Sequence, residues 1–389
     1  MYDLLVVGAG PAGSRTAALM AAAGHSVALL EEHAAAGEPV HCTGIVGEDC
    51  MQRYALPPAL VRKLLPHFEV IAPDGTVCPL PGSVYVLDRA GLDRLLAERA
   101  RHAGAELHTG CRALQVQERA DRVSVEVRRA DGVEWLEARH VVLACGAMST
   151  LPRRSGLAEP EAWYRSVQSE WETPPPTTAR VLLGSAFSQG AFAWTVPLGP
   201  TSIKMGLLSP TSVRQGYHRL TDGLPGRPLG RAEWRRMPMG LVSRSVRGRV
   251  AAVGDAAGQV KTTTGGGIYY ALRCADLLAQ ALLAGRLDRY EPSWRELVGR
   301  DLHSGRLARR LLERLDDAEM NRLVRLCRRD EVQGLLANHW HFDFHQGILR
   351  ALATAPGLRR LAAETCTTHG FQHLLKVTDR LRLVPGLRR

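Results

Sequence analysis

The chain has 389 residues, 45% of them hydrophobic, and carries 50 Lys and Arg against 39 Asp and Glu, a net charge of +11. The hydrophobic content excludes a chain that is disordered throughout, and the length predicts two or three packed units. No run of about 18 uncharged apolar residues occurs, so the sequence predicts no membrane-spanning helix. The N-terminus lacks the order of regions that marks a signal peptide, so we expect a cytoplasmic protein.

The first predicted unit is a strand over residues 2–7, a helix over residues 14–24 and a second strand over residues 26–30. The turn between strand and helix reads G-x-G-x-x-G, as in dinucleotide-binding folds, where its glycines permit a tight turn and a close approach to a pyrophosphate. A carboxylate at the end of the second strand can accept hydrogen bonds from ribose hydroxyls, which favours FAD or NAD over NADP. The cofactor-binding residues expected here are Gly8, Gly10, Pro11, Ala12, Gly13, Glu31 and Glu32.

The next segments continue an α/β pattern and then change character. We expect a loop over residues 34–50, a helix over residues 88–103, short strands over residues 105–143 and a buried strand over residues 140–144. Residues 163–240 instead alternate strand-like runs with Pro-rich breaks, which predicts an antiparallel sheet. We therefore assign residues 1–160 and 245–290 to a discontinuous cofactor domain and residues 161–244 to an inserted antiparallel-sheet substrate domain.

A second glycine-rich motif follows the buried strand expected over residues 249–254. An Asp directly after a strand, followed by small residues and a helix start, suits a sugar-like chain, and the helix N-terminus can stabilise negative charge on a reduced flavin. Two distant segments that close on one extended cofactor favour FAD over NAD. The expected contacts are Gly254, Asp255, Gly265, Gly266, Gly267 and Ile268.

The remainder, residues 291–389, is expected to form a C-terminal helical region. Residues 295–389 hold 18 Arg and Lys against 11 Asp and Glu, which indicates either a solvated arginine-rich surface or a face on anionic lipid headgroups. No pattern supports a nucleic-acid partner. The His-rich stretch at residues 339–345 and the eight scattered cysteines lack metal-ligand spacing, so we predict no metal site. We interpret Trp340, Phe342 and Phe344 as an aromatic, amphipathic surface near the mouth of a substrate tunnel or at a membrane interface.

Three stretches together resemble the geranylgeranyl reductase family of flavoproteins, which is similar in fold to para-hydroxybenzoate hydroxylase. The glycine-rich run at residues 254–271 is similar to the family's own, residues 39–44 match its P-x-x-C-x-G loop, and residues 192–197 with Gly206 match its Y-x-W-x-F-P…G motif. The last match is looser, because Phe192 and Val196 replace the Tyr and Phe. The resemblance covers residues 1 to about 290.

The resemblance implies an FAD-dependent enzyme that saturates isolated carbon–carbon double bonds of a prenyl chain by hydride transfer. It implies that Cys42 lies near the flavin and supports catalysis, and that Arg89 contacts FAD, although an Arg89–Asp93 salt bridge at the helix start explains the same pattern. The expected substrate contacts are Phe192, Trp194 and Pro197. The alternatives are an FAD-dependent monooxygenase or hydroxylase on the same fold and a quinone-linked electron-transfer flavoprotein.

The electron donor and the membrane relation are further expectations. Cys145 stands where relatives carry the Asp of D-G-x-x-S, which argues against a hydroxylase-type NADPH site, and we expect NAD(P)H to act as the donor without a separate nicotinamide domain. A prenyl lipid must be collected from a bilayer, so we expect peripheral contact with an anionic membrane, at its inner face.

Overall fold

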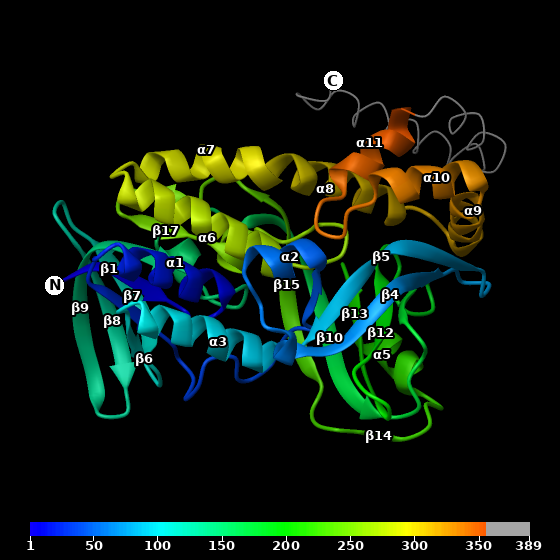
Figure 1. The fold of residues 1–389 in the computed structure, drawn as a ribbon, viewed down its shortest axis with the longest axis horizontal. Helices are drawn as coiled ribbons and strands as arrows, with labels where there is room; N and C mark the ends of the chain where they lie inside the picture. The colour runs from blue at the N-terminus through cyan, green and yellow to red at the C-terminus, as the bar shows by residue number, and fades with distance from the viewer. Residues whose placement is uncertain (355–389) are drawn as a thin grey trace.

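Five parallel strands form the centre of the first sheet in the computed structural model, which describes residues 1–354 (Figure 1). Their order is β17-β9-β1-β2-β6, the arrangement of a Rossmann-type domain, and β7 and β8 extend β9 as an antiparallel meander. The strands are β1 (Tyr2–Val7), β2 (Val27–Leu30), β6 (Glu106–His108), β7 (Arg112–Glu118), β8 (Val123–Arg129), β9 (Gly132–Leu143), β16 (Val246–Arg247) and β17 (Val250–Ala252).

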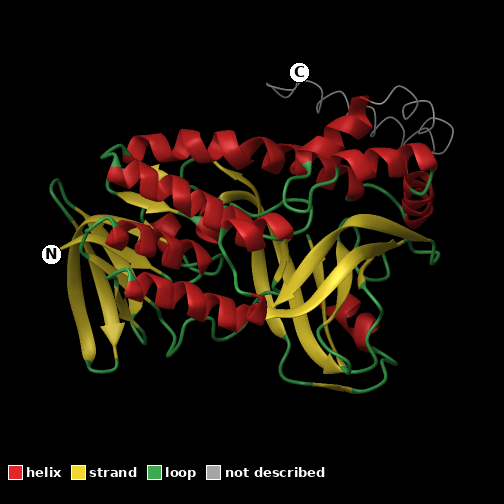
Figure 2. Cartoon of the chain, in the orientation of Figure 1, coloured by secondary structure: helices red, strands yellow, loops and turns green. Residues whose placement is uncertain are grey.

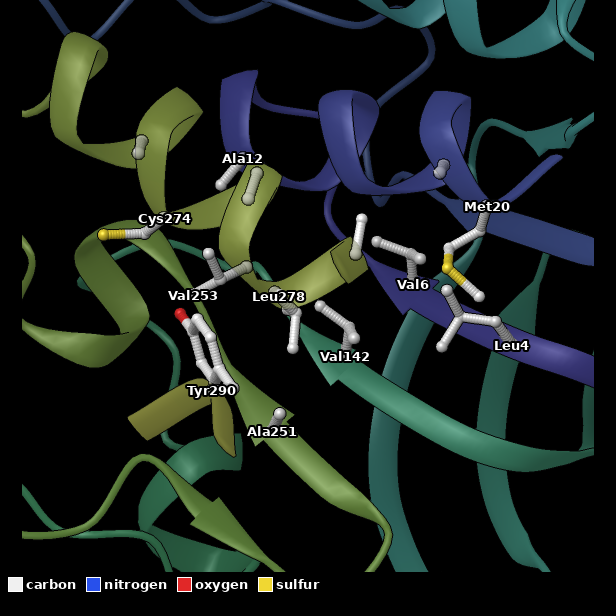
Figure 3. Close-up of a cluster of buried hydrophobic side chains, with 14 of the residues drawn as sticks. Leu4, Val6, Ala12, Met20, Val142, Ala251, Val253, Cys274, Leu278 and Tyr290 are labelled. Atoms are coloured by element: carbon white, nitrogen blue, oxygen red, sulfur yellow. The ribbon is translucent and has the colours of Figure 1, made fainter. Parts of the chain in front are cut away.

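The alternation of side chains explains why β1 and β2 are apolar at every position. Leu4 and Val6 belong to a core cluster with residues of α1 (Pro11–Ala22), α3 (Arg89–His102) and α6 (Ile268–Leu283). Figure 3 shows them beside Met20 of α1 and Leu278 of α6. Leu5 and Val7 face the opposite side, where the valines of β8 cover them. A sheet that is buried on both faces requires such continuous hydrophobic strands.

The second sheet has nine strands in the described part of the chain, with the path β14-β10-β13-β12-β11-β4-β5-β3 and with β15 paired to β10. All its pairs are antiparallel except β4 with β11. The strands are β3 (Ile45–Gly47), β4 (Val61–Ile71), β5 (Val77–Leu87), β10 (Pro160–Glu172), β11 (Ala179–Leu182), β12 (Phe192–Pro197), β13 (Ser202–Ser209), β14 (Arg227–Pro228) and β15 (Glu233–Val242).

The pairing of β3, β4 and β5 differs from the sequence expectation. These strands come from the segment assigned to the cofactor domain, whereas the expected sheet used residues 161–244 alone. The β4–β5 hairpin leaves one edge of β4 free, and β11 pairs with this edge, so that Phe68 lies opposite Ala179. The resulting sheet is therefore mostly rather than wholly antiparallel. The division into domains itself stays a prediction.

Helices dominate the chain after β17, as expected for the described part of residues 291–389 (Figure 2). In Figure 1, α7 and α8 run above both sheets, while α9 and α10 contact β5. Residues 355–389 lie outside the described residues. The remaining helices are α2 (Glu48–Arg53), α4 (Leu151–Arg154), α5 (Arg214–Thr221), α7 (Tyr290–Trp294), α8 (Arg300–Leu312), α9 (Asp317–Cys327), α10 (Asp330–His339) and α11 (Gln346–Thr354). Short 3-10 turns lie at Pro58–Leu60, Gly254–Ala257 and Leu287–Arg289, and a π-helical segment at Arg295–Gly299 joins α7 to α8.

The helix α6 offers a direct test of this core. Leu278 is fully buried between α1 and the first sheet, so Leu278→Ala should lower the free energy of unfolding by about 2–5 kcal/mol, through lost burial and a residual cavity. Leu283 lies on the same helix but is 46% exposed, and Leu283→Ala should change stability by less than about 0.5 kcal/mol. Urea unfolding followed by circular dichroism measures both, and equal losses would contradict this assignment of the core.

Candidate functional site

The three glycines of the first motif have different physical roles. Gly8 has φ = +105°, and a Cβ at this position would lie 2.5 Å from the carbonyl oxygen of Ala144. A Cβ at Gly13 would overlap the carbonyl oxygen of Gly8, so this residue lets α1 pack against the turn. A Cβ at Gly10 would meet no atom within 4 Å, because Gly10 borders a cavity. The position leaves room for a ligand rather than for another part of the chain.

The start of α1 and the end of β2 complete this side of the cavity. Pro11 occupies the first turn of α1, which has no side-chain cap, so its N-terminal amides are available to an anion. Glu31 is buried, and its carboxylate accepts hydrogen bonds from the backbone amides of Ala9 and His33, both at 3.0 Å. Glu32 also lines the cavity, and its Oε2 lies 3.4 Å from Nε of Arg112. The arrangement suits the ribose and pyrophosphate of a dinucleotide.

The second motif meets the first across the cavity. A Cβ at Gly254 would lie 3.1 Å from the Cβ of Ala12, so the two turns are in near contact. Asp255 lines the cavity and is exposed, and loss of hydration raises the pKa of its carboxyl against the opposing effect of Arg89. The N-terminus of α6 opens onto the same space without a side-chain cap, through Gly265, Gly266, Gly267 and Ile268.

Of the two roles that the sequence left open for Arg89, the structure shows the ion pair, and the contact with FAD stays a prediction. Arg89 forms an ion pair with Asp93 on the same helix, and burial raises the pKa of Asp93 while the guanidinium partly opposes this shift. Its Nε atom is buried and has no hydrogen-bond partner among the described residues, although Arg89 also interacts with the Cys42 side chain. A buried donor without a partner on the wall of a cavity fits a ligand acceptor.

The Cys42 loop lies between the cofactor segments and the second sheet. Cys42 is half-buried and lines the cavity, and its Sγ accepts a hydrogen bond from the Gly44 amide at 3.4 Å. Lys204 of β13 donates to the Cys42 carbonyl, also at 3.4 Å. His41 contacts Arg235 instead of the thiol, and loss of hydration together with the Arg235 charge lowers the pKa of His41 to about 4.

The cavity, about 1110 Å³ in volume, continues from these polar segments into an apolar half. Side chains alternate along β12, so Phe192, Trp194 and Val196 line the cavity, whereas Pro197 is absent from its wall. Pro197 was expected to contact substrate, and the structure does not bring it to the site. The apolar wall consists of Phe68, Val70, Leu80, Val84, Val181, Leu183, Phe192, Trp194, Val196, Trp340 and Phe342.

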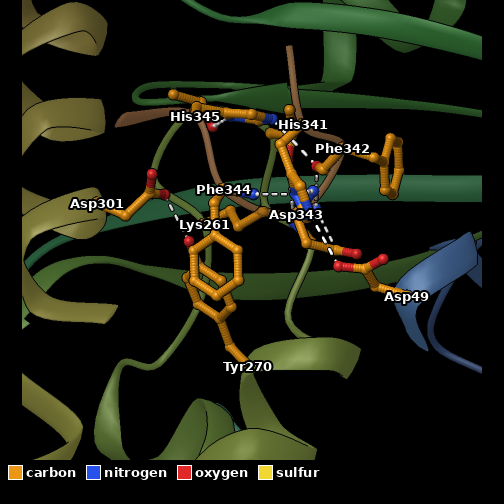
Figure 4. A network of polar contacts seen from close by, with 12 residues as sticks. Asp49, Lys261, Tyr270, Asp301, His341, Phe342, Asp343, Phe344 and His345 are labelled. Carbon is orange, nitrogen blue, oxygen red and sulfur yellow. Dashed lines mark hydrogen bonds and ion pairs between the residues drawn. The ribbon is translucent and has the colours of Figure 1, made fainter. Parts of the chain in front are cut away.

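Residues 340–345, between α10 and α11, contribute side chains to the cavity wall. Trp340, Phe342 and His345 line the cavity, and Trp340 lies 5.6 Å from the ring of Phe68. Phe344 packs against Tyr270 at 5.5 Å, as Figure 4 shows from close by. Trp340 and Phe342 thus lie on the cavity wall, partly buried against the chain itself, and contact of this stretch with a membrane interface stays a prediction. The density of aromatic residues was the available signal for a second cavity wall.

Arg309 also lines the cavity, although no pattern in the sequence marked it as a site residue. Arg309 of α8 is buried beside the cavity and donates hydrogen bonds to the carbonyl oxygens of Thr262 and Gly190. Cys145, at the position of the Asp of D-G-x-x-S, lines the cavity together with Met148, and burial raises the pKa of Cys145 to about 11. The fold brings these residues and Arg309 to one cavity from distant parts of the sequence.

Comparison with known proteins agrees with this geometry. Residues 2–172 match the pyridine nucleotide-disulphide oxidoreductase family model, and residues 212–337 match the lycopene cyclase protein model. The fold is similar to the crystal structure of a geranylgeranyl bacteriochlorophyll reductase-like protein from Thermoplasma acidophilum, with a TM-score of 0.82 at 21% identity, over 94% of this chain and 99% of that one. It is also similar to p-nitrophenol 4-monooxygenase from Pseudomonas putida, with a TM-score of 0.71 at 20% identity, over 87% of this chain and 97% of that one.

Fold, cavity and these matches define the class, an FAD-dependent oxidoreductase with a Rossmann-type domain. A digeranylgeranylglycerophospholipid reductase from Methanothermobacter thermautotrophicus is 33% identical over 83% of this chain and 91% of its own length. One from Methanopyrus kandleri is 28% identical over 86% of this chain and 92% of its own length. The chain belongs to the digeranylgeranylglycerophospholipid reductase family.

The different surroundings of Gly10 and Gly13 give a paired prediction. Gly10→Ala should leave the thermal stability of the FAD-free protein unchanged but weaken FAD binding by about tenfold or more, about 1.4 kcal/mol, because the methyl group enters the cavity. Gly13→Ala should lower the stability of the FAD-free protein itself. Fluorescence titration with FAD and thermal unfolding measure the two effects, and a stability loss in Gly10→Ala would contradict the assignment.

Proposed function

We propose that this protein saturates carbon–carbon double bonds of a prenyl chain in a geranylgeranyl-type lipid. The observation that carries the proposal is one continuous cavity, whose polar half is lined by both cofactor motifs and whose apolar half is lined by the second sheet and residues 340–345. The curated relatives, which are named digeranylgeranylglycerophospholipid reductases, support this substrate class.

The reaction assigns separate tasks to the two halves of the cavity. Bound FAD supplies, when reduced, a hydride for one carbon of the double bond. Gly10, the N-terminus of α1 and Asp255 hold the cofactor, and Arg89 offers its free Nε to it. Isolated alkenes are weak hydride acceptors, so the apolar wall must exclude water and hold one carbon pair in position, which Phe192, Trp194 and Trp340 do.

The second carbon of the double bond must receive a proton, and we propose that this proton is delivered in the neighbourhood of Cys42. Its thiol lies at the junction of the two halves of the cavity, held by the Gly44 amide and next to the Arg89 guanidinium. From this position the thiol can position the substrate, relay a proton or gate access between the halves. The neighbouring His41 is less suited, because its low pKa keeps it neutral and its ring contacts Arg235.

The donor and the membrane relation are part of the same proposal. We propose NAD(P)H as the electron donor, which would reach the flavin through the cavity itself, because the described residues contain only one glycine-rich strand–turn–helix unit of the dinucleotide type.

No helix in residues 1–354 is long and apolar enough to cross a bilayer. A basic protein with a lipid substrate is consistent with peripheral contact at the inner face of an anionic membrane.

An anaerobic turnover experiment tests the function. The purified flavoprotein is reduced with dithionite, a geranylgeranyl-type lipid is added without oxygen, and flavin absorbance is followed together with the substrate mass. We expect reoxidation of the flavin with a gain of two hydrogens for each bond reduced. Reoxidation that occurs only with oxygen, together with a gain of one oxygen atom in the substrate, would instead identify a monooxygenase like the structural neighbour from Pseudomonas putida.

Replacement of the thiol tests the role of Cys42. Cys42→Ala should retain FAD but slow the substrate-dependent reoxidation by about 100-fold, the scale of a lost proton-transfer group. Cys50→Ala is the matched control, since Cys50 is fully buried and does not line the cavity. Single-turnover absorbance measurements distinguish the variants. An unchanged rate in Cys42→Ala would remove the thiol from the mechanism.

A further inference from the structure

The loop before α6 makes several hydrogen bonds to the C-terminal helical region. Thr262 Oγ1 donates to the carbonyl oxygen of Leu302, and Arg309 Nε donates to the carbonyl oxygen of Thr262. The Thr263 hydroxyl bonds to Nδ1 of His345. The C-terminal region therefore fixes the residues that lead into the cofactor-facing helix.

A buried ion pair forms the centre of this contact. Lys261 Nζ lies 3.0 Å from Asp343 Oδ1, 2.9 Å from the carbonyl oxygen of Phe342 and 4.2 Å from the centre of the Phe342 ring. The side chains of Lys261 and Asp343 are only 4% and 3% exposed. Figure 4 shows the pair beside Phe344 and His345. Two charges are thus kept where desolvation is costly, and a well-packed apolar pair would cost the fold less.

The position of the lysine places its charge at the start of α6. The Lys261 amide donates to the Gly266 carbonyl at 2.9 Å, and the Gly265 amide donates to the Lys261 carbonyl at 2.7 Å. A Cβ at Gly266 would lie 3.3 Å from Lys261 Nζ. Both residues line the cavity, and α6 begins two residues later at Ile268. The ammonium group therefore adds to the positive end of the helix dipole.

Other titratable groups surround the pair, and Lys261 also acts on the nearby Asp301 carboxyl. Burial and the nearby Lys261 lower the pKa of His345 to about 3, so its ring is neutral. Asp343 Oδ2 is buried without a hydrogen-bond partner among the described residues. Asp301 is buried, and its carboxylate accepts hydrogen bonds from the hydroxyl of Tyr270 and the amide of Gln346. The carboxylate of Asp343 is thus the direct counter-charge of Lys261.

We propose that the Lys261–Asp343 pair sets the electrostatic potential at the start of α6 and thereby the reduction potential of the bound FAD. Reduction of FAD by two electrons with uptake of one proton adds a negative charge to the flavin, which a positive potential stabilises. The positive charge of Lys261 raises the electrostatic potential at the start of α6, and the negative charge of Asp343 limits this rise. The residues act as positioning residues through the helix start, and the proposal requires bound FAD but not the prenyl substrate.

Charge variants of the holoenzyme test the proposal without any lipid. Asp343→Asn leaves the Lys261 charge uncompensated, so the midpoint potential should shift upward. The double variant Lys261→Met with Asp343→Asn removes both charges, and its potential should return close to that of the unaltered protein. If Asp343→Asn does not fold, Lys261→Met alone leaves the carboxylate and should shift the potential downward. Anaerobic reductive titration against a dye of known potential measures each value.

A second ion pair in the helical region is the matched control. Arg306 lies on α8, and Glu313 follows the last residue of this helix. Their atoms Nη1 and Oε1 are 2.7 Å apart, and both side chains are partly buried and do not line the cavity. Glu313→Gln should leave the potential unchanged. If the single-charge variants shift the potential no more than Glu313→Gln, while their thermal stability falls, the pair only ties the loop and the proposal is overturned. Failure of the alkene-reduction experiment would leave this result unaffected.

Discussion

The site depends on the close approach of backbone to backbone at the carboxyl ends of β1, β9 and β17. Gly8 lies against Ala144, Gly13 against Gly8, and Gly254 against Ala12, at distances that leave no room for a Cβ at the first two glycines. Ligands of open α/β sheets bind outside the carboxyl ends of the strands, so these contacts decide where a cofactor can lie. The uncapped N-termini of α1 and α6 both open there, and the second sheet and the C-terminal region are arranged around this edge.

Much of the cofactor half could be predicted from the sequence, because its signals are local. A strand, a glycine pattern and a helix within about 30 residues define the first turn, and β1, β2 and α3 lie within one residue of their expected bounds. The residues around Gly254 and Gly265–Gly267 do line the cavity, as expected. Their chemical roles, and the role of Cys42, remain predictions.

The apolar half was harder to predict because tertiary contacts define it. The pairing of β4 with β11 joins segments more than 100 residues apart, and no local pattern specifies such a partner. The expected place of Pro197 on the cavity wall is missed for a different reason. Successive side chains of a strand lie on opposite faces, so Val196 lines the cavity and Pro197 does not. Residues 340–345 combine polar and aromatic side chains, a pattern that does not separate a membrane-facing surface from a cavity wall. Only the packing of Trp340 against Phe68 and of Phe344 against Tyr270 shows that these rings face the protein itself.

The route of the chain through the second sheet has an evolutionary consequence. Parallel neighbours must be joined by crossover connections. Here the connection from β2 to β6 contains β3–β5, and the connection from β9 to β17 contains β10–β15. Lengthening a connection adds little to the entropic cost of closing it. The sequence and length of these two connections can therefore change while the parallel strands keep their pairing. The apolar wall can thus change in evolution without disturbing the first sheet, and the solved structures of a monooxygenase and a halogenase, 20% and 19% identical to this chain, have a similar fold.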